Sequence, residues 1–267
     1  MFPSFFTLYV FIDIVWKMPY NARMKKIYML LLLGLAGCHH ITVPDNFTYR
    51  EIRTDGYTLA SWQKITDPTA PVRIYIEGDG YAFNYAGQPT SDPTPRGTFL
   101  RQIAFQDPNA NVVYLARPCQ YVTEAQCTPE DWTTGRFSQK IISATTQAVR
   151  HITNGRPVIL IGYSGGALLS GLIIKQNPAL PVQKWITLAG VLNHTKWTED
   201  LHLPPLTNSI DLEKLPSVPQ IHFVGDKDKI VSAKMTQTIV PAENLTIVPG
   251  ATHSSGFETI MPLLYQP

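Results

Sequence analysis

One serine near the middle of the chain limits what this sequence can fold into more than any other residue. Ser164 is the centre of residues 162–166, which match the pattern G-x-S-x-G. The apolar run 158–161 precedes this pattern and predicts a strand, and the small and apolar residues 167–169 follow it and predict a helix. Glycines two positions before and after the serine allow the strand and the helix to approach closely. This context favours a strained strand–turn–helix with a reactive serine over an ordinary tight turn with a surface serine.

Strand-like and helix-like segments alternate along most of the chain. Two alternating segments, 47–53 and 57–63, flank Asp55-Gly56, which predicts an antiparallel hairpin. Strands and helices then alternate, which favours a mostly parallel central sheet with helices on both faces. The expected strands are 72–76, 111–115, 157–161, 184–188, 220–224 and 245–248, and the expected helices are 98–105, 138–152, 165–175 and 254–264.

A serine hydroxyl is a weak nucleophile at neutral pH and needs a base that is itself oriented by a partner. His253 is the one histidine after residue 228, and it lies between the last expected strand and the last expected helix. Two carboxylates, Asp226 and Asp228, follow the expected strand 220–224 and compete for the role of partner.

The order and placement of these residues resemble the α/β-hydrolase superfamily over about residues 46–267. More closely, the chain resembles exported bacterial lipoproteins of that fold, through Arg117-Pro118-Cys119-Gln120-Tyr121 and Trp132-Thr133. The resemblance implies an α/β-hydrolase fold and a triad in the chain order Ser, Asp, His, which are Ser164, Asp228 and His253 here. The family pattern G-x-x-D, read from Gly225, selects Asp228 and leaves Asp226 as a turn residue.

The resemblance also implies two backbone N–H donors for an oxyanion. One is the N–H of Gly165, and the other belongs to the loop after the strand 72–76. Many relatives carry His-Gly in that loop, where this chain has Glu77-Gly78, so the second donor is expected at Asp79, with Gly80 the next choice. An acidic side chain near an oxyanion is unfavourable unless it points away or pairs with a cation.

Aromatic residues follow the expected oxyanion loop. Tyr81, Phe83 and Tyr85 are candidates for an apolar acyl pocket, although aromatic packing beneath a loop explains them equally well. Gly80 and Tyr163 are further candidates for pocket residues, because each lies beside an expected catalytic group.

These features together predict a serine hydrolase that cleaves a carboxylic ester of a small-molecule acyl substrate through a covalent acyl-enzyme. The alternatives are a serine peptidase or amidase of the cell envelope and a non-catalytic lipoprotein scaffold of the same fold. No cofactor is expected, and no metal, since no Cys or His cluster has ligand spacing. The formal net charge is only +2, and no basic stripe is interleaved with aromatic residues, which argues against nucleic-acid binding.

The first 37 residues have the composition of an export segment. They hold four of the 22 basic and one of the 20 acidic residues. This layout predicts a signal peptide that starts at Met24, with the apolar run 27–36 behind two lysines. Residues 35–38 resemble a bacterial lipobox, which implies cleavage before Cys38 and a diacylglyceryl group on its thiol. An ordinary signal peptide is the alternative. We expect 38–45 to be a tether and 46–267 to be the hydrolase domain.

Two further predictions follow from export. The residue after Cys38 is His39 and not the aspartate that resembles an inner-membrane retention signal. In an organism with two membranes, the expected location is therefore the outer membrane, on its periplasmic face or at the cell surface. With Cys38 lipidated, Cys119 and Cys127 remain, and an even pair in an exported protein predicts a disulfide rather than two free buried thiols.

Overall fold

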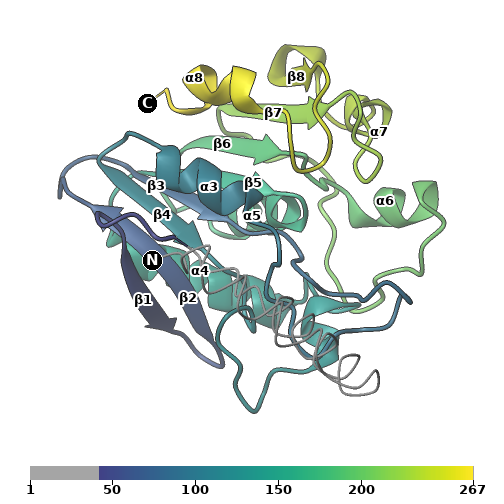
Figure 1. The fold of residues 1–267 in the computed structure, drawn as a ribbon, viewed down its shortest axis with the longest axis horizontal. Coiled ribbons are helices and arrows are strands. Elements are labelled where there is room, and N and C mark those ends of the chain that lie inside the picture. The colour runs from purple at the N-terminus through teal and green to yellow at the C-terminus, as the bar shows by residue number, and fades with distance from the viewer. Residues whose placement is uncertain (1–41, 267) are drawn as a thin grey trace, which may run out of the picture. The chain divides into compact units, whose positions relative to one another are not determined.

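The predicted hairpin and strands form one eight-stranded sheet in the computed structural model, which describes residues 42–266 (Figure 1). The strand order is β1-β2-β4-β3-β5-β6-β7-β8. The strands are β1 (Thr48–Arg53), β2 (Thr58–Ile65), β3 (Val72–Ile76), β4 (Asn111–Leu115), β5 (Val158–Tyr163), β6 (Val182–Leu188), β7 (Gln220–Gly225) and β8 (Leu245–Val248).

The sheet is antiparallel at its N-terminal edge and parallel from β4 to β8. β1 pairs with β2, and β2 with β4, in antiparallel register. All pairings from β4 through β3, β5, β6 and β7 to β8 are parallel. Gly56 makes the hairpin turn with a φ of 104°, which glycine adopts without steric cost. The predicted α/β-hydrolase fold, with its N-terminal hairpin and mostly parallel sheet, is confirmed.

Helices cover both faces of the sheet, and Figure 1 shows α3 on one face and α4 and α5 on the other. The strand β3 illustrates why both faces need a cover, because its side chains alternate between the two layers. Ile74 and Ile76 join the apolar core under α4 and α5, whereas Arg73 and Tyr75 point to Asp107, the residue that follows α3. The helices are α3 (Phe99–Gln106), α4 (Gln139–Thr153), α5 (Gly165–Gln176), α6 (His194–Asp200), α7 (Ala233–Gln237) and α8 (Met261–Leu264), with 3-10 turns η1 (Pro129–Trp132), η2 (Ala242–Asn244) and η3 (Glu258–Ile260).

The prediction of one helix over 254–264 is wrong. The chain is irregular to Phe257 and then forms only η3 and α8. Gly256 adopts a φ of 82°, which is incompatible with a right-handed helix, and Pro262 suits the first turn of a helix but not its interior. The short helices α6 and α7 were not expected, because one or two turns give no periodic signal in a sequence.

Several expectations for the N-terminus lie outside the described residues. These are the export segment 1–37, the lipobox 35–38 with Cys38, and residues 38–41 of the tether 38–45. Within residues 42–266, none of the helices has the length and apolar character needed to cross a membrane.

A buried polar network ties the C-terminal end of the chain to β3. Arg73 pairs with Asp107 through Nε at 2.6 Å, and Tyr75 donates a hydrogen bond to the same carboxylate oxygen at 2.6 Å. The guanidinium also donates to the carbonyl oxygens of Leu264 and Gln266, at 2.5 and 3.1 Å. Burial of such charges is stabilising only while each one keeps its partners.

Asp107→Asn is therefore expected to lower the free energy of unfolding by about 3 kcal/mol, since it leaves the Arg73 guanidinium buried without a counter-charge. Urea unfolding followed by circular dichroism measures this. Asp200→Asn is the control, because Asp200 pairs with Lys196 on the exposed surface of α6 and should contribute little. Equal stability of the two variants would contradict the proposed importance of the network.

Candidate active site

The turn between β5 and α5 presents Ser164 at the carboxyl edge of the sheet. Ser164 is not helical but adopts a φ of 51° and a ψ of −122°, a strained conformation for a residue with a side chain. Three backbone hydrogen bonds hold it: its N–H donates to the carbonyl of Leu188 at 3.1 Å, and its carbonyl accepts from the N–H groups of Val191 at 3.0 Å and Ala167 at 3.1 Å. The neighbouring strand β6 and the loop after it therefore help to hold Ser164 in this strained conformation.

The glycines of the pattern are required by backbone contacts. A Cβ on Gly162 would lie 2.5 Å from the Cα of Ala167, and one on Gly166 would lie 2.5 Å from the carbonyl oxygen of Glu77. These neighbours are backbone atoms and cannot rotate away. The sequence pattern thus reports a strand and a helix that touch without intervening side chains.

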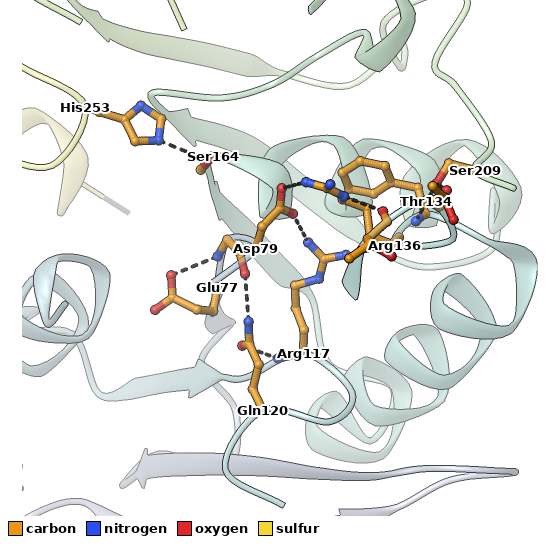
Figure 2. A network of polar contacts seen from close by, with 12 residues as sticks. Glu77, Asp79, Arg117, Gln120, Thr134, Arg136, Ser164, Ser209 and His253 are labelled. Carbon is orange, nitrogen blue, oxygen red and sulfur yellow. Dashed lines mark hydrogen bonds and ion pairs between the residues drawn. The ribbon is translucent and has the colours of Figure 1, made fainter. Parts of the chain in front are cut away.

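Ser164, His253 and Asp228 come together in one chain of contacts. His253 Nε2 lies 3.0 Å from Ser164 Oγ, and His253 Nδ1 lies 2.9 Å from Asp228 Oδ2 (Figure 2 shows the first contact). Asp228 is buried, and its other oxygen accepts hydrogen bonds from the N–H groups of Ile230 and Val231 at 2.8 and 2.9 Å. The carboxylate is therefore fixed from both sides.

Asp226 occupies a different place. Its side chain is exposed, and it accepts a hydrogen bond from the N–H of Gly250 at 2.7 Å. This contact joins the loop after β7 to the loop that carries His253. Asp226 thus shapes the turn, as the sequence analysis expected, while Asp228 faces the imidazole.

The loop after β3 runs directly beside the serine. A Cβ on Gly78 would lie 3.0 Å from Ser164 Cβ. The backbone N–H of the next residue, Asp79, is therefore close to the nucleophile. Among residues 42–266, neither the N–H of Asp79 nor that of Gly165 donates a hydrogen bond. Both expected oxyanion donors are therefore free to bind an oxygen atom at this edge of the sheet.

The two acidic residues of this loop are each compensated (Figure 2). Glu77 is buried and turned back, accepting hydrogen bonds from Tyr114 at 2.6 Å and from the N–H of Gly78 at 2.8 Å. Burial raises the pKa of Glu77, and these two hydrogen bonds offset part of the effect. Asp79 pairs with Arg117 at 2.5 Å through one oxygen and with Arg136 through the other.

The ion pairs decide the protonation of Asp79. Burial by itself raises its pKa, but Arg136 and Arg117 lower it by more, and the net pKa lies below the usual range of an aspartate. Asp79 is therefore a carboxylate whose charge is taken up by two guanidinium groups, not a free charge facing the serine.

Sequence reasoning did not assign Arg117, Gln120 or Arg136 to the site. Gln120 donates a hydrogen bond to the carbonyl of Gly78 at 3.0 Å and accepts one from the N–H of Arg117 at 3.0 Å. A signal was present, since Arg117 and Gln120 belong to the loop motif by which the chain resembles exported lipoproteins. Arg136 carried no such signal.

The loop that carries Arg117 and Gln120 is cross-linked. The structure contains the predicted disulfide between Cys119 and Cys127, with the two Cα atoms 5.7 Å apart. Cys119 and Tyr121 both have positive φ angles, 70° and 65°, so the loop is tightly folded on either side of Gln120. The cross-link thus lies beside the residue that supports the oxyanion loop.

A cavity of about 500 Å³ opens at the serine, within the size range of small-molecule sites. Of the expected pocket residues, Gly80, Tyr163 and Phe83 line it, together with Ser164 and His253. Further apolar contributions come from Phe99, Leu100, Trp197 and Ile230.

Two of the expected pocket aromatics lie elsewhere. Tyr81 does not line this cavity: Gly80 turns the chain with a φ of 66°, and the centroid of the Tyr81 ring lies 3.4 Å from the guanidinium of Arg96. Tyr85 is fully exposed in a turn built around Asn84, whose side-chain oxygen accepts hydrogen bonds from the N–H groups of Ala86 and Gln88.

A family model described as "Serine hydrolase (FSH1)" matches residues 104–252, more than half of the chain. The chain belongs to the FSH1 serine hydrolase family. The match includes Ser164 and Asp228 and ends one residue before His253. No curated protein matches the sequence.

Solved structures share the fold of this FSH1 family member at low sequence identity. Est1E from Butyrivibrio proteoclasticus, with ferulic acid bound, is 14% identical over 81% of this chain and 94% of that one, with a TM-score of 0.58. A protein from Thermoplasma acidophilum, predicted to be a CIB-like hydrolase, is 17% identical over 82% and 98%, with a TM-score of 0.55. The thioesterase domain from the curacin biosynthetic pathway is 12% identical over 82% and 99%, with a TM-score of 0.52.

The pattern G-x-S-x-G allows any residue at position 165, but this structure has no space for a side chain there. A Cβ there would overlap the carboxylate oxygen Oδ1 of Asp79 and lie 3.1 Å from Nη1 of Arg117. We expect Gly165→Ala to lower the free energy of unfolding by about 1–3 kcal/mol, measured by urea unfolding.

Gly97→Ala is the matched control, because a Cβ there meets nothing within 4 Å. In an Asp79→Ala background the Gly165→Ala change should cost less, since the overlapping oxygen is gone. A Gly165→Ala variant as stable as Gly97→Ala would show that the carboxylate moves aside freely.

Proposed function

We propose that this protein hydrolyses carboxylic esters through a covalent acyl-enzyme, with Ser164 as nucleophile, His253 as general base and Asp228 as the orienting acid. The observation that carries the proposal is the unbroken chain of contacts from Ser164 Oγ through the His253 ring to Asp228, at 3.0 and 2.9 Å. Membership of a serine hydrolase family supports the general chemistry.

The reaction begins with attack on the ester carbonyl. Ser164 Oγ forms a bond to the carbonyl carbon while its proton moves to His253 Nε2. The imidazolium then donates that proton to the leaving alcohol as the carbon–oxygen bond of the ester breaks. Water, deprotonated by His253, adds to the acyl-enzyme, and collapse of this second intermediate releases the acid and returns the proton to Ser164.

Negative charge develops on the carbonyl oxygen in both steps. We assign the N–H groups of Asp79 and Gly165 as its donors, because the first follows the glycine in contact with Ser164 and the second follows Ser164 itself. Removal of one such donor typically costs about 3 kcal/mol of transition-state stabilisation. The paired state of Asp79 supports this assignment, since an unpaired carboxylate would oppose the developing charge.

An ester rather than a peptide is proposed because part of the wall of the cavity beside Ser164 is apolar, although Arg96 and Arg136 line it too; the apolar part is formed by Phe83, Phe99, Leu100, Trp197 and Ile230. Phe83, which lines it, is 40% exposed. The presence of a thioesterase domain among the similar structures agrees with acyl transfer. A peptidase and a non-catalytic scaffold are the outcomes that the following test separates from the proposal.

The test labels the purified domain with a fluorophosphonate probe and assays p-nitrophenyl esters beside peptide amides. The wild type should label and cleave esters, and Ser164→Ala should do neither. Asp228→Asn should lower kcat by roughly 10³–10⁴-fold, because the histidine loses its orienting charge.

Asp226→Asn is the matched control for Asp228→Asn, as it removes a carboxylate two residues away that contacts a backbone N–H instead of the histidine. It should retain most of the activity. Labelling that survives in Ser164→Ala would sink the nucleophile assignment, and a wild type that neither labels nor turns over any ester or amide would favour the scaffold.

We further propose that the mature chain begins at a lipidated Cys38 and is held at the outer membrane, with 38–45 as the tether. The basic residues before the apolar run 27–36 and the lipobox-like 35–38 support this. Two acyl chains on one residue are sufficient for stable anchoring.

Cys38→Ser is expected to abolish incorporation of radiolabelled palmitate and to move the protein from the detergent phase to the aqueous phase in a phase-partition experiment. His40→Ser is the control, because it lies two residues after Cys38, leaves the lipobox-like 35–38 intact and should leave lipidation unaltered. Palmitate incorporation by Cys38→Ser would refute the assignment.

A further inference from the structure

The charge cluster beside the nucleophile carries more positive than negative charge. One carboxylate, that of Asp79, faces two guanidinium groups, those of Arg117 and Arg136. The arginine side chains are 4% and 5% exposed. A buried charge without a counter-ion is costly, so this cluster favours the approach of an anion.

The other carboxylate of the loop does not remove the excess. Glu77 turns away to Tyr114, and the cations that act on it are Arg101 and Arg117. Arg101 of α3 is itself buried and donates a hydrogen bond to Tyr121 at 2.9 Å. In the cluster as a whole, two carboxylates, Glu77 and Asp79, face three guanidinium groups, those of Arg101, Arg117 and Arg136.

Arg136 differs from Arg117 in having an edge that is open to the cavity. Its Nε donates to the carbonyl of Thr133 at 2.6 Å, and its Nη1 pairs with Asp79. Its Nη2 has no partner among residues 42–266, and the side chain lines the same cavity as Ser164 and His253. An arginine held in place on two sides and unpaired on the third is preorganised to bind a planar anion.

A second cation lies at the rim of this cavity. Arg96 is exposed and lies over the ring of Tyr81, 3.4 Å from its centroid. The ring holds the guanidinium in position without neutralising it. Arg96 and Arg136 both line the cavity, so an anionic group that enters meets one cation at the rim and another at the inner wall.

We propose that the substrate carries a carboxylate or similar anionic group within a few bonds of the scissile carbonyl, and that Arg136, assisted by Arg96, binds it. This inference rests on the proposed ester hydrolysis at Ser164 and specifies its substrate class. Arg136 and Arg96 are specificity-determining residues in this assignment, and the reacting atoms remain with the triad.

The experiment compares p-nitrophenyl half-esters of succinate, glutarate and adipate with neutral p-nitrophenyl esters of equal chain length. We expect the wild type to prefer at least one half-ester by roughly ten- to a hundredfold in kcat/KM, mainly through KM, as for hydrogen bonds to charged groups. Varying the chain length finds the member whose carboxylate reaches Arg136.

Arg136→Gln should abolish most of this preference while neutral esters are still cleaved. The variant should fold, because Asp79 keeps Arg117 and the two form a neutral pair. Arg96→Gln, at an exposed position, should weaken the preference independently. Arg150→Gln is the control, since Arg150 is an exposed arginine on α4 whose side chain donates a hydrogen bond to Asn177 and does not line the cavity.

Three results would overturn the proposal. The first is a wild type that cleaves charged and neutral esters equally, and the second is a preference that is unchanged in Arg136→Gln and Arg96→Gln. The third is an equal loss of kcat/KM on charged and neutral esters in Arg136→Gln, which would give Arg136 a structural or general catalytic role. Failure of the proposed function looks different, because then Ser164 would not label and no ester of either type would turn over.

Discussion

The close approach of α5 to the ends of β3 and β5 is the constraint on which the rest of the site depends. A Cβ added at Gly162 or at Gly166 would overlap backbone atoms of the facing segment. Because β3 to β8 run parallel, their carboxyl ends share one edge of the sheet, and the loops that follow them meet there. The depth at which α5 sits therefore sets the position of Ser164 relative to residues from four other loops.

Much of the fold could be predicted because its signals are local. The hairpin turn at Asp55-Gly56 and the strands 72–76, 111–115 and 245–248 were found with the bounds that the structure shows, since each is a short apolar run ended by polar or turn residues. The prediction of the last helix was wrong for an equally local reason. Gly256 has a positive φ, which the apolar spacing of the segment does not indicate.

The candidate site was predictable only in part. Ser164 stands in a contiguous pattern and His253 follows the last expected strand, so motif and chain order named these two, whereas the choice of Asp228 over Asp226 needed the family pattern G-x-x-D. The ion pairs of Asp79 join residues 38 and 57 positions apart, and no local pattern specifies such a pairing. The same holds for Tyr81, whose neighbour Arg96 is placed by the fold of the intervening loop.

The loop beside Ser164 carries two acidic residues, Glu77 and Asp79, and the rest of the structure provides binding partners for both of them. Where many relatives have His-Gly this chain has Glu77-Gly78, and Tyr114 binds the Glu77 carboxylate away from the serine. The next carboxylate of the loop, that of Asp79, is bound by Arg117 and Arg136 from later parts of the chain. Position 165 is then glycine for a reason unrelated to the turn, since the Asp79 carboxylate occupies the space that a side chain there would fill. Each of the two carboxylates is thus accommodated by its own set of residues.

The contact of Arg73 with the carbonyls of Leu264 and Gln266 also bears on when the protein can fold. Leu264 and Gln266, which accept hydrogen bonds from Arg73, lie 191 and 193 positions after it in the chain. His253 and β8 also follow most of the sheet in sequence, so a nascent chain has neither a fully bonded Arg73 nor a complete triad before these residues have been synthesised. The native state therefore depends on contacts between residues far apart in the sequence, and a shorter nascent chain cannot form it.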